Sequence, residues 1–146
     1  MNRSVTLTVD VAADVARVFE ILSTTDGQRA FWTVDCDLSP DRARFGFAHA
    51  PVDLEAQVTT EPGKLVRMRV ESGFPFWEGS TWEWELGEAT RVESGTSVLF
   101  RHYDFAEGYP EADLGHTAQT WALILDRLVG YVASGAPQPF FPAPSA

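Results

Sequence analysis

Cysteine, basic residues and long apolar runs are all scarce in this sequence, and each scarcity excludes a class of protein. Cys36 is the only cysteine, so no disulfide can form within the chain, and a reducing intracellular compartment fits. The chain has 11 Lys and Arg against 21 Asp and Glu, a net charge of −10. This balance argues against nucleic acid and anionic membrane surfaces as partners, because both require clustered basic residues.

Membrane and export signals are missing as well. No apolar run approaches the roughly 20 residues of a membrane span. The N-terminus lacks the continuous apolar segment of a signal peptide. We therefore expect a cytoplasmic globular protein with no membrane insertion.

Recognisable catalytic and metal-binding motifs are also absent. The sequence contains no HExxH, paired-Cys, GxSxG, Gly-rich phosphate loop or dinucleotide fingerprint. Its histidines, His49, His102 and His116, are not spaced as a metal site. We expect His49 in an exposed loop and Cys36 in the core. The sequence therefore predicts no metal and no cofactor, and it favours a protein that is not an enzyme.

One long helix organises the 146 residues, which are enough for a single domain with a substantial core. Between Leu114 and Ser134, apolar residues recur at alternating four- and three-residue spacing, which places them on one stripe. The stripe comprises Leu114, Ala118, Trp121, Leu125, Leu128 and Val132. Gly135 and Pro137 end the helix, and the Pro-rich tail from about residue 136 is expected to be irregular. Such a helix needs a sheet to pack against.

Most of the chain before this helix has the alternating pattern of half-buried strands. The predicted strands span residues 4–9, 33–38, 42–47, 54–60, 65–71, 81–86 and 96–105. After the first strand the apolar spacing changes and predicts two short helices, at 14–23 and 26–31.

Side chains on the last three strands also predict a register. If their apolar faces form one wall, the outward faces bring opposite charges together across the strands. A one-residue slip would turn every Trp outward, so the two faces agree on one arrangement. The predicted opposite pairs are Met68 with Trp84, Trp84 with Phe100, Glu83 with Arg69 and Arg101, and Glu85 with Arg67.

The order of elements resembles the START-related helix-grip, or SRPBCC, superfamily. Residues 5–24, VTLTVDVAADVARVFEILST, resemble its opening strand and first helix. Residues 95–105, GTSVLFRHYDF, and 120–140, TWALILDRLVGYVASGAPQPF, resemble the closing strand and helix of the branch named after the heat-shock-protein-90 ATPase activator. Thr120 precedes Trp121 where that branch often has a Gly-Trp pair. The resemblance implies one α+β domain over 1–146, in which a seven-stranded curved antiparallel sheet grips the long helix around an internal cavity.

Members of this superfamily bind lipids, hormones or polyketides, cyclise polyketides, or contact a chaperone, so the resemblance leaves three functions open. The first is binding of a small, largely apolar ligand, aromatic or polyketide-like, in the cavity. The second is a cyclase- or aromatase-type enzyme that uses His102 as acid or base. The third is a chaperone- or partner-interaction domain. We favour the first, because no acid–base constellation is recognisable and we expect no accessory module beside this domain.

The predicted ligand site consists of inward-facing apolar and aromatic side chains. It comprises Phe45, Phe47, Met68, Trp82, Trp84, Phe100, His102, Trp121 and Leu125. His102 and Asp104 share the inner face of the closing strand, which makes them candidates for a general base and its orienting partner. A buried structural histidine is the alternative for His102.

An apolar run at residues 74–77 lies in a predicted loop, where such residues are unusual. Phe74, Phe76 and Trp77 form a lid over the cavity mouth, complete the core, or bind a second copy of the chain in a homodimer. The sequence leaves these alternatives open.

Overall fold

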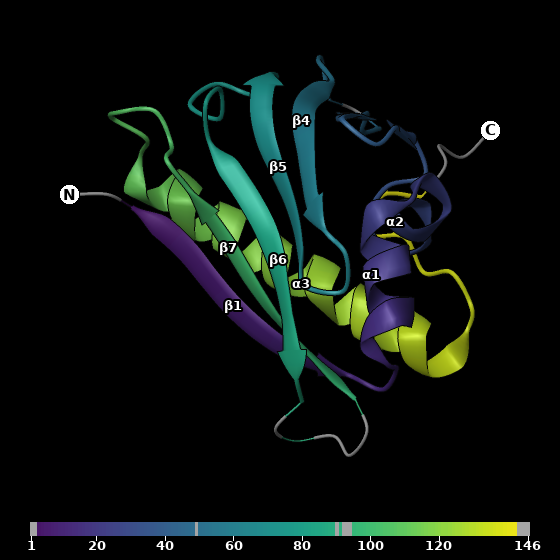
Figure 1. Cartoon of the computed structure of the whole chain (residues 1–146). Coiled ribbons are helices and arrows are strands. Elements are labelled where there is room, and N and C mark those ends of the chain that lie inside the picture. The colour runs from purple at the N-terminus through teal and green to yellow at the C-terminus, as the bar shows by residue number, and fades with distance from the viewer. Residues whose placement is uncertain (1–2, 49, 90, 92–94, 143–146) are drawn as a thin grey trace.

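The computed structural model describes residues 3–48, 50–89, 91 and 95–142, and over these it contains three helices and seven strands (Figure 1). The helices are α1 (Val15–Ser23), α2 (Thr25–Phe31) and α3 (Glu111–Ser134). The strands are β1 (Ser4–Val11), β2 (Cys36–Leu38), β3 (Arg42–Phe45), β4 (Leu54–Glu61), β5 (Leu65–Ser72), β6 (Thr81–Glu88) and β7 (Thr96–Tyr103). The predicted order of elements is confirmed.

The seven strands described form one antiparallel sheet in the order β1-β7-β6-β5-β4-β3-β2. β1 and β2 therefore lie at opposite edges, although only α1 and α2 separate them in the sequence. Figure 1 shows α3 crossing one face of the curved sheet, with α1 and α2 at one end of it. The predicted α+β helix-grip architecture is confirmed.

Local capping explains where the two short helices begin. The Asp14 carboxylate accepts a hydrogen bond from the Arg17 N–H at 2.9 Å, which caps α1. The Thr24 hydroxyl accepts one from the Gly27 N–H at 3.1 Å, which caps α2.

Helix α3 begins one turn earlier than the apolar stripe indicated. Glu111 and Asp113 lie inside its first turn, where the helix dipole favours negative charge. Gly135 ends the helix in the left-handed region, at φ 74°, and its N–H donates to the Tyr131 carbonyl at 2.8 Å.

The pairing of β5 with β6 differs from the predicted register by two residues. Met68 lies opposite Trp82, and Val66 lies opposite Trp84, so the predicted pair of Met68 with Trp84 is wrong. Trp84 does lie opposite Phe100. A two-residue shift keeps every side chain on its own face, so the hydrophobic pattern cannot distinguish the two registers.

The same offset changes the charged partners on the outer face. Glu83 lies between Arg67 and Arg101, and its carboxylate accepts hydrogen bonds from Arg67 Nε at 3.0 Å and Arg101 Nη1 at 3.1 Å. The predicted partners Arg69 for Glu83 and Arg67 for Glu85 are therefore wrong. The principle of opposite charges across the strands holds.

Bulky side chains fill most of the space between the sheet and α3. Trp82, Trp84 and Phe100 of the sheet and Trp121 and Leu125 of α3 are at most 2% exposed. The interior that the resemblance implied to be a cavity is therefore largely a packed core, and open space lies towards one end of α3.

The Pro-rich tail docks on the rest of the domain, although it has no helix or strand of its own through Pro142. The N–H groups of Gln138, Phe140 and Phe141 donate to the carbonyls of residues 30, 31 and 32 at 2.7, 3.1 and 2.7 Å. The Val34 N–H returns a bond to the Phe141 carbonyl at 3.2 Å. The tail thus runs parallel to the segment that follows α2.

Candidate functional site

A hollow of about 550 Å³ lies beside the N-terminal half of α3, next to the loop of residues 73–80 that joins β5 to β6. Aromatic side chains dominate its wall, and we call it the aromatic pocket. Its wall consists of Trp32, Phe47, Ala48, Ala50, Phe74, Pro75, Phe76, Trp77, Tyr109, Asp113, His116, Thr117, Thr120, Trp121, Ile124 and Phe141.

Two of the nine residues predicted to bind a ligand, Phe47 and Trp121, line the aromatic pocket. The structure does not bring the others to its wall, because they pack against one another deeper in the core, each at most 1% exposed. These are Phe45, Met68, Trp82, Trp84, Phe100, His102 and Leu125. Strand alternation identified the inner face correctly, but it does not distinguish a residue at the pocket from one behind it.

All three residues of the predicted lid, Phe74, Phe76 and Trp77, line the aromatic pocket. Phe76 is 37% exposed, and its backbone has φ 70°, which is unusual for an aromatic residue. Its carbonyl accepts a hydrogen bond from the Ala106 N–H at 2.8 Å. A strained backbone that presents an apolar ring at a pocket rim is typical of functional loops.

A line of hydroxyl and indole groups joins this loop to α3. Trp77 Nε1 donates to Tyr109 Oη at 3.1 Å, and Tyr109 Oη lies 2.7 Å from Thr117 Oγ1. Both hydroxyl-bearing residues are buried. Displacement of Trp77 from the pocket would therefore break its bond to Tyr109, which is itself bonded to Thr117 of α3.

The polar part of the wall is one face of α3. Asp113, His116, Thr117 and Thr120 are spaced three and four residues apart, which places them on the same side of the helix. The Thr120 hydroxyl donates to the His116 carbonyl at 2.9 Å. These four residues were not predicted from the sequence, although their positions on the same helix as Trp121 were the available signal.

His102 lies behind the wall in a complete chain of hydrogen bonds. Its Nδ1 accepts from Trp121 Nε1 at 3.1 Å, so its Nε2 carries the proton and donates to Ser80 Oγ at 2.9 Å. Ser80 in turn donates to the Trp77 carbonyl at 2.6 Å. We call these four residues the His102 chain.

Burial leaves His102 neutral. The side chain is fully buried, and desolvation lowers the pKa of its imidazole to about 3. Both ring nitrogens are engaged, so neither is free for a ligand. This geometry agrees with the structural alternative rather than with a general base.

Asp104 does not share the inner face with His102, so the predicted pair is wrong. β7 ends at Tyr103, and Asp104 turns into the left-handed region at φ 63°. Strand alternation stops there, and the Asp104 side chain is exposed.

Cys36 and His116 lie in different parts of the molecule. Cys36 is buried as expected, and desolvation raises the pKa of its thiol to about 11, which is unsuited to a nucleophile. His116 belongs to the pocket wall. His49 lies outside the described residues.

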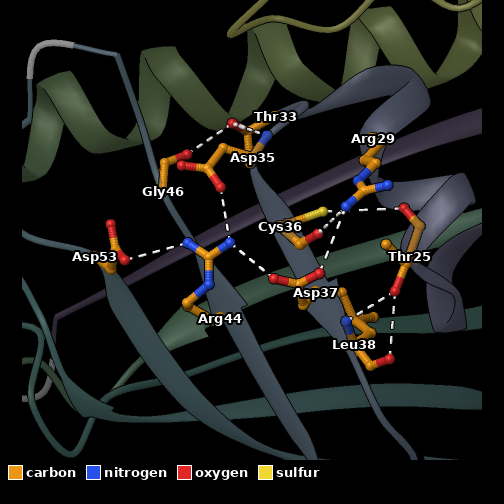
Figure 2. A network of polar contacts seen from close by, with 10 residues as sticks. All are labelled: Thr25, Arg29, Thr33, Asp35, Cys36, Asp37, Leu38, Arg44, Gly46 and Asp53. Atoms are coloured by element: carbon orange, nitrogen blue, oxygen red, sulfur yellow. Dashed lines mark hydrogen bonds and ion pairs between the residues drawn. The ribbon is translucent and has the colours of Figure 1, made fainter. Parts of the chain in front are cut away.

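A polar network holds the segment that carries Phe47 against the residues that precede β2 (Figure 2). Thr33 Oγ1 donates to the Gly46 carbonyl at 2.8 Å, and the Gly46 N–H donates to the Asp35 carbonyl at 2.7 Å. A Cβ atom at Gly46 would collide with the Asp35 carboxylate, so a larger residue here would require the Asp35 side chain to move from its place beside Arg44.

Arg44 completes this network from β3. Its guanidinium reaches Asp35 at 2.7 Å, Asp37 at 2.8 Å and Asp53 at 3.2 Å, as Figure 2 shows. These ion pairs join Arg44 of β3 to β2, to the residues before β2 and to the residue before β4.

In the part of the chain that the structure describes, no three His, Cys, Asp or Glu side chains converge as a metal site requires. None of the helices in that part has the length and apolar character needed to cross a membrane. The expected absence of a metal and a cofactor stays a prediction.

Comparison with known proteins identifies the fold. No family model matches the sequence, and no curated protein matches it. The Aha1 dimer from Colwellia psychrerythraea is similar in structure, with a TM-score of 0.77 at 23% identity, over 91% of this chain and 98% of that chain.

Two further structures have the same architecture. DynU16, a protein of the dynemicin biosynthetic locus, has a TM-score of 0.73 at 18% identity, over 95% of this chain and 50% of its own. CalU16 from Micromonospora echinospora has a TM-score of 0.64 at 18% identity, over 92% of this chain and 78% of its own. The predicted resemblance to the helix-grip proteins is confirmed as a likeness of fold.

Proposed function

We propose that this protein binds a small, largely apolar ligand, aromatic or polyketide-like, in the aromatic pocket. The observation that carries the proposal is the concentration of aromatic side chains around a hollow of about 550 Å³, within the usual range of ligand sites. A few polar groups on one face of α3 complete the wall, as in most small-molecule sites. DynU16, one of the structural neighbours, comes from a biosynthetic locus, which agrees with a small-molecule ligand.

The loop of residues 73–80 acts as a lid in this proposal. Phe74 and Trp77 lie against each other with ring centroids 5.2 Å apart, and both contribute to the wall. Phe76 is held in a strained conformation at the rim. Ligand entry requires the loop to move, and the bond from Trp77 to Tyr109 stabilises the closed position.

A cyclase- or aromatase-type reaction is the second candidate function. Its acid or base would not be His102, the residue predicted from the sequence. His102 is fully buried with both nitrogens engaged, whereas His116 lies in the pocket wall. An acid–base reaction in this pocket would therefore use His116. If a bound molecule is converted by the wild type but not by His116→Gln, the protein is an enzyme.

The remaining partner expectations stay predictions. Aha1 forms a dimer in its own structure, which supports a homodimer for this chain without identifying the interface. A chaperone partner and a cytoplasmic location likewise stay predictions.

Binding can be tested with a neutral apolar fluorophore, N-phenyl-1-naphthylamine. We expect saturable one-to-one binding and quenching of tryptophan fluorescence, because Trp32, Trp77 and Trp121 line the pocket. Phe47→Ala removes a wall residue and should weaken binding by about tenfold.

Phe19→Ala is the matched control. Phe19 is also a partly buried aromatic residue, but it lies on α1 and does not line the pocket. Its truncation should lower stability and leave the dissociation constant unchanged. Failure of the wild type to bind, or equal losses in both variants, would contradict the proposal.

A further inference from the structure

We propose that the ligand of the aromatic pocket is an organic cation, an amine or quaternary ammonium group on an apolar body. This inference rests on the proposed function and specifies its ligand class. It follows from which side chains form the wall and from the charge that they carry.

Aromatic rings from separate segments gather around the hollow. Trp77 of the loop and Trp121 of α3 are nearly parallel, at 18°, with centroids 6.5 Å apart. Trp32 lies 5.0 Å from Trp121, and Phe74 lies 5.2 Å from Trp77. The negative face of an aromatic ring attracts a cation within about 6 Å, and tryptophan does so most strongly.

The formal charge of the wall has the complementary sign. Asp113 contributes a carboxylate, and the described wall contains neither Lys nor Arg. Asp113 forms no ion pair with any residue that the structure describes. The exposed carboxylate of Asp113 is therefore available to a cationic ligand.

An anionic ligand has no comparable support. The N-terminus of α3 would attract an anion, but Glu111 and Asp113 already occupy its first turn and oppose that attraction. The net charge of −10 further favours approach of cations and disfavours anions at low ionic strength.

Three probes of similar shape test the proposal. Benzyltrimethylammonium is the cation, neopentylbenzene is its neutral carbon isostere, and benzylsulfonate is the anion. Dissociation constants are measured at low salt by tryptophan quenching and by ligand NMR. We expect the cation to bind about tenfold more tightly than the neutral isostere, and the anion to bind most weakly.

Two variants separate the local contributions. Asp113→Asn should weaken binding of the cation severalfold and leave the neutral probe unchanged. Phe76→Leu keeps apolar volume but removes a ring from the rim, so it should also affect the cation more than the neutral probe.

Asp126→Asn is the control for overall charge. Asp126 lies on the same helix, is exposed and is outside the pocket wall, so its loss changes net charge equally without touching the site. We expect it to preserve the ratio of cation to neutral binding.

The outcomes distinguish this inference from the proposed function. If the neutral probe binds as tightly as the cation, or if Asp126→Asn matches Asp113→Asn, the cation preference is overturned while the pocket stands as a binding site. If none of the probes and no N-phenyl-1-naphthylamine binds, both proposals fail.

Discussion

His102 is buried as a neutral imidazole between Trp121 of α3 and Ser80 of the loop before β6, and this burial makes stability depend on pH. The folded protein holds the pKa of this ring at about 3, whereas an ordinary histidine has a value of 6.5. Between those values the unfolded state binds more protons. Stability should therefore fall as the pH drops below about 6.5, by up to about 1.4 kcal/mol per pH unit, and this group has no effect at higher pH. Urea unfolding between about pH 5 and pH 8 measures the slope.

His102→Gln tests the assignment of this slope. Glutamine can accept from the Trp121 indole and donate to Ser80, but it does not titrate in this range. The slope should flatten in this variant and persist in His116→Gln, which removes an exposed histidine instead. A slope equal to that of the wild type in His102→Gln would show that other groups cause it.

Two buried tryptophans offer a second comparison of single residues. Trp121 donates to His102 Nδ1, whereas the indole N–H of Trp84 has no partner among the described residues. Phenylalanine removes a similar volume at either position, but Trp121→Phe also leaves a buried acceptor unpaired. We expect Trp121→Phe to cost about 1–3 kcal/mol more than Trp84→Phe in chemical unfolding. Equal losses would mean that the hydrogen bond contributes little.

Among the larger elements, the docked tail links the C-terminus to the pocket. Phe141 lines the wall and packs on Phe47, with centroids 5.0 Å apart. Phe140 instead lies beside the Arg127 guanidinium, 5.9 Å from its centre, and outside the wall. Phe141→Ala should therefore weaken binding of N-phenyl-1-naphthylamine severalfold, while Phe140→Ala lowers the melting temperature without changing affinity. The reverse pattern would show that the tail does not shape the site.

Helices and strands were predictable because their apolar periods differ, but two relationships between elements were not. The pairing of Met68 with Trp82 rather than Trp84 depends on the geometry of the loop 73–80, since a two-residue shift preserves both faces. Docking of the tail depends on long-range backbone hydrogen bonds that leave no periodic signal. The adjacent pair of Phe140 and Phe141 in a Pro-rich segment was the available indication of burial.

For the molecule as a whole, the sequence predicted the architecture better than the site. Inward-facing Trp82, Trp84 and Trp121 were identified from spacing, and all three are buried. Whether such residues line a hollow or fill it depends on how their volumes interlock, which alternation does not encode. The loop at 74–77 was singled out because apolar residues are unusual at an expected turn, but the sequence left open whether it forms a lid, completes the core or binds a second copy.

The pairing of β1 with β7 has a consequence for how the chain is made. Val5 lies opposite His102, so more than two thirds of the 146 residues must be synthesised before the first strand can pair with its partner. Forming a contact between residues so far apart in the sequence has a large cost in loop-closure entropy, which slows folding. During translation β1 therefore remains unpaired, with its apolar face exposed, until β7 has been synthesised. A nascent chain stalled before Thr96 should thus be a target for chaperones, whereas release of β7 from the ribosome allows the sheet to be completed.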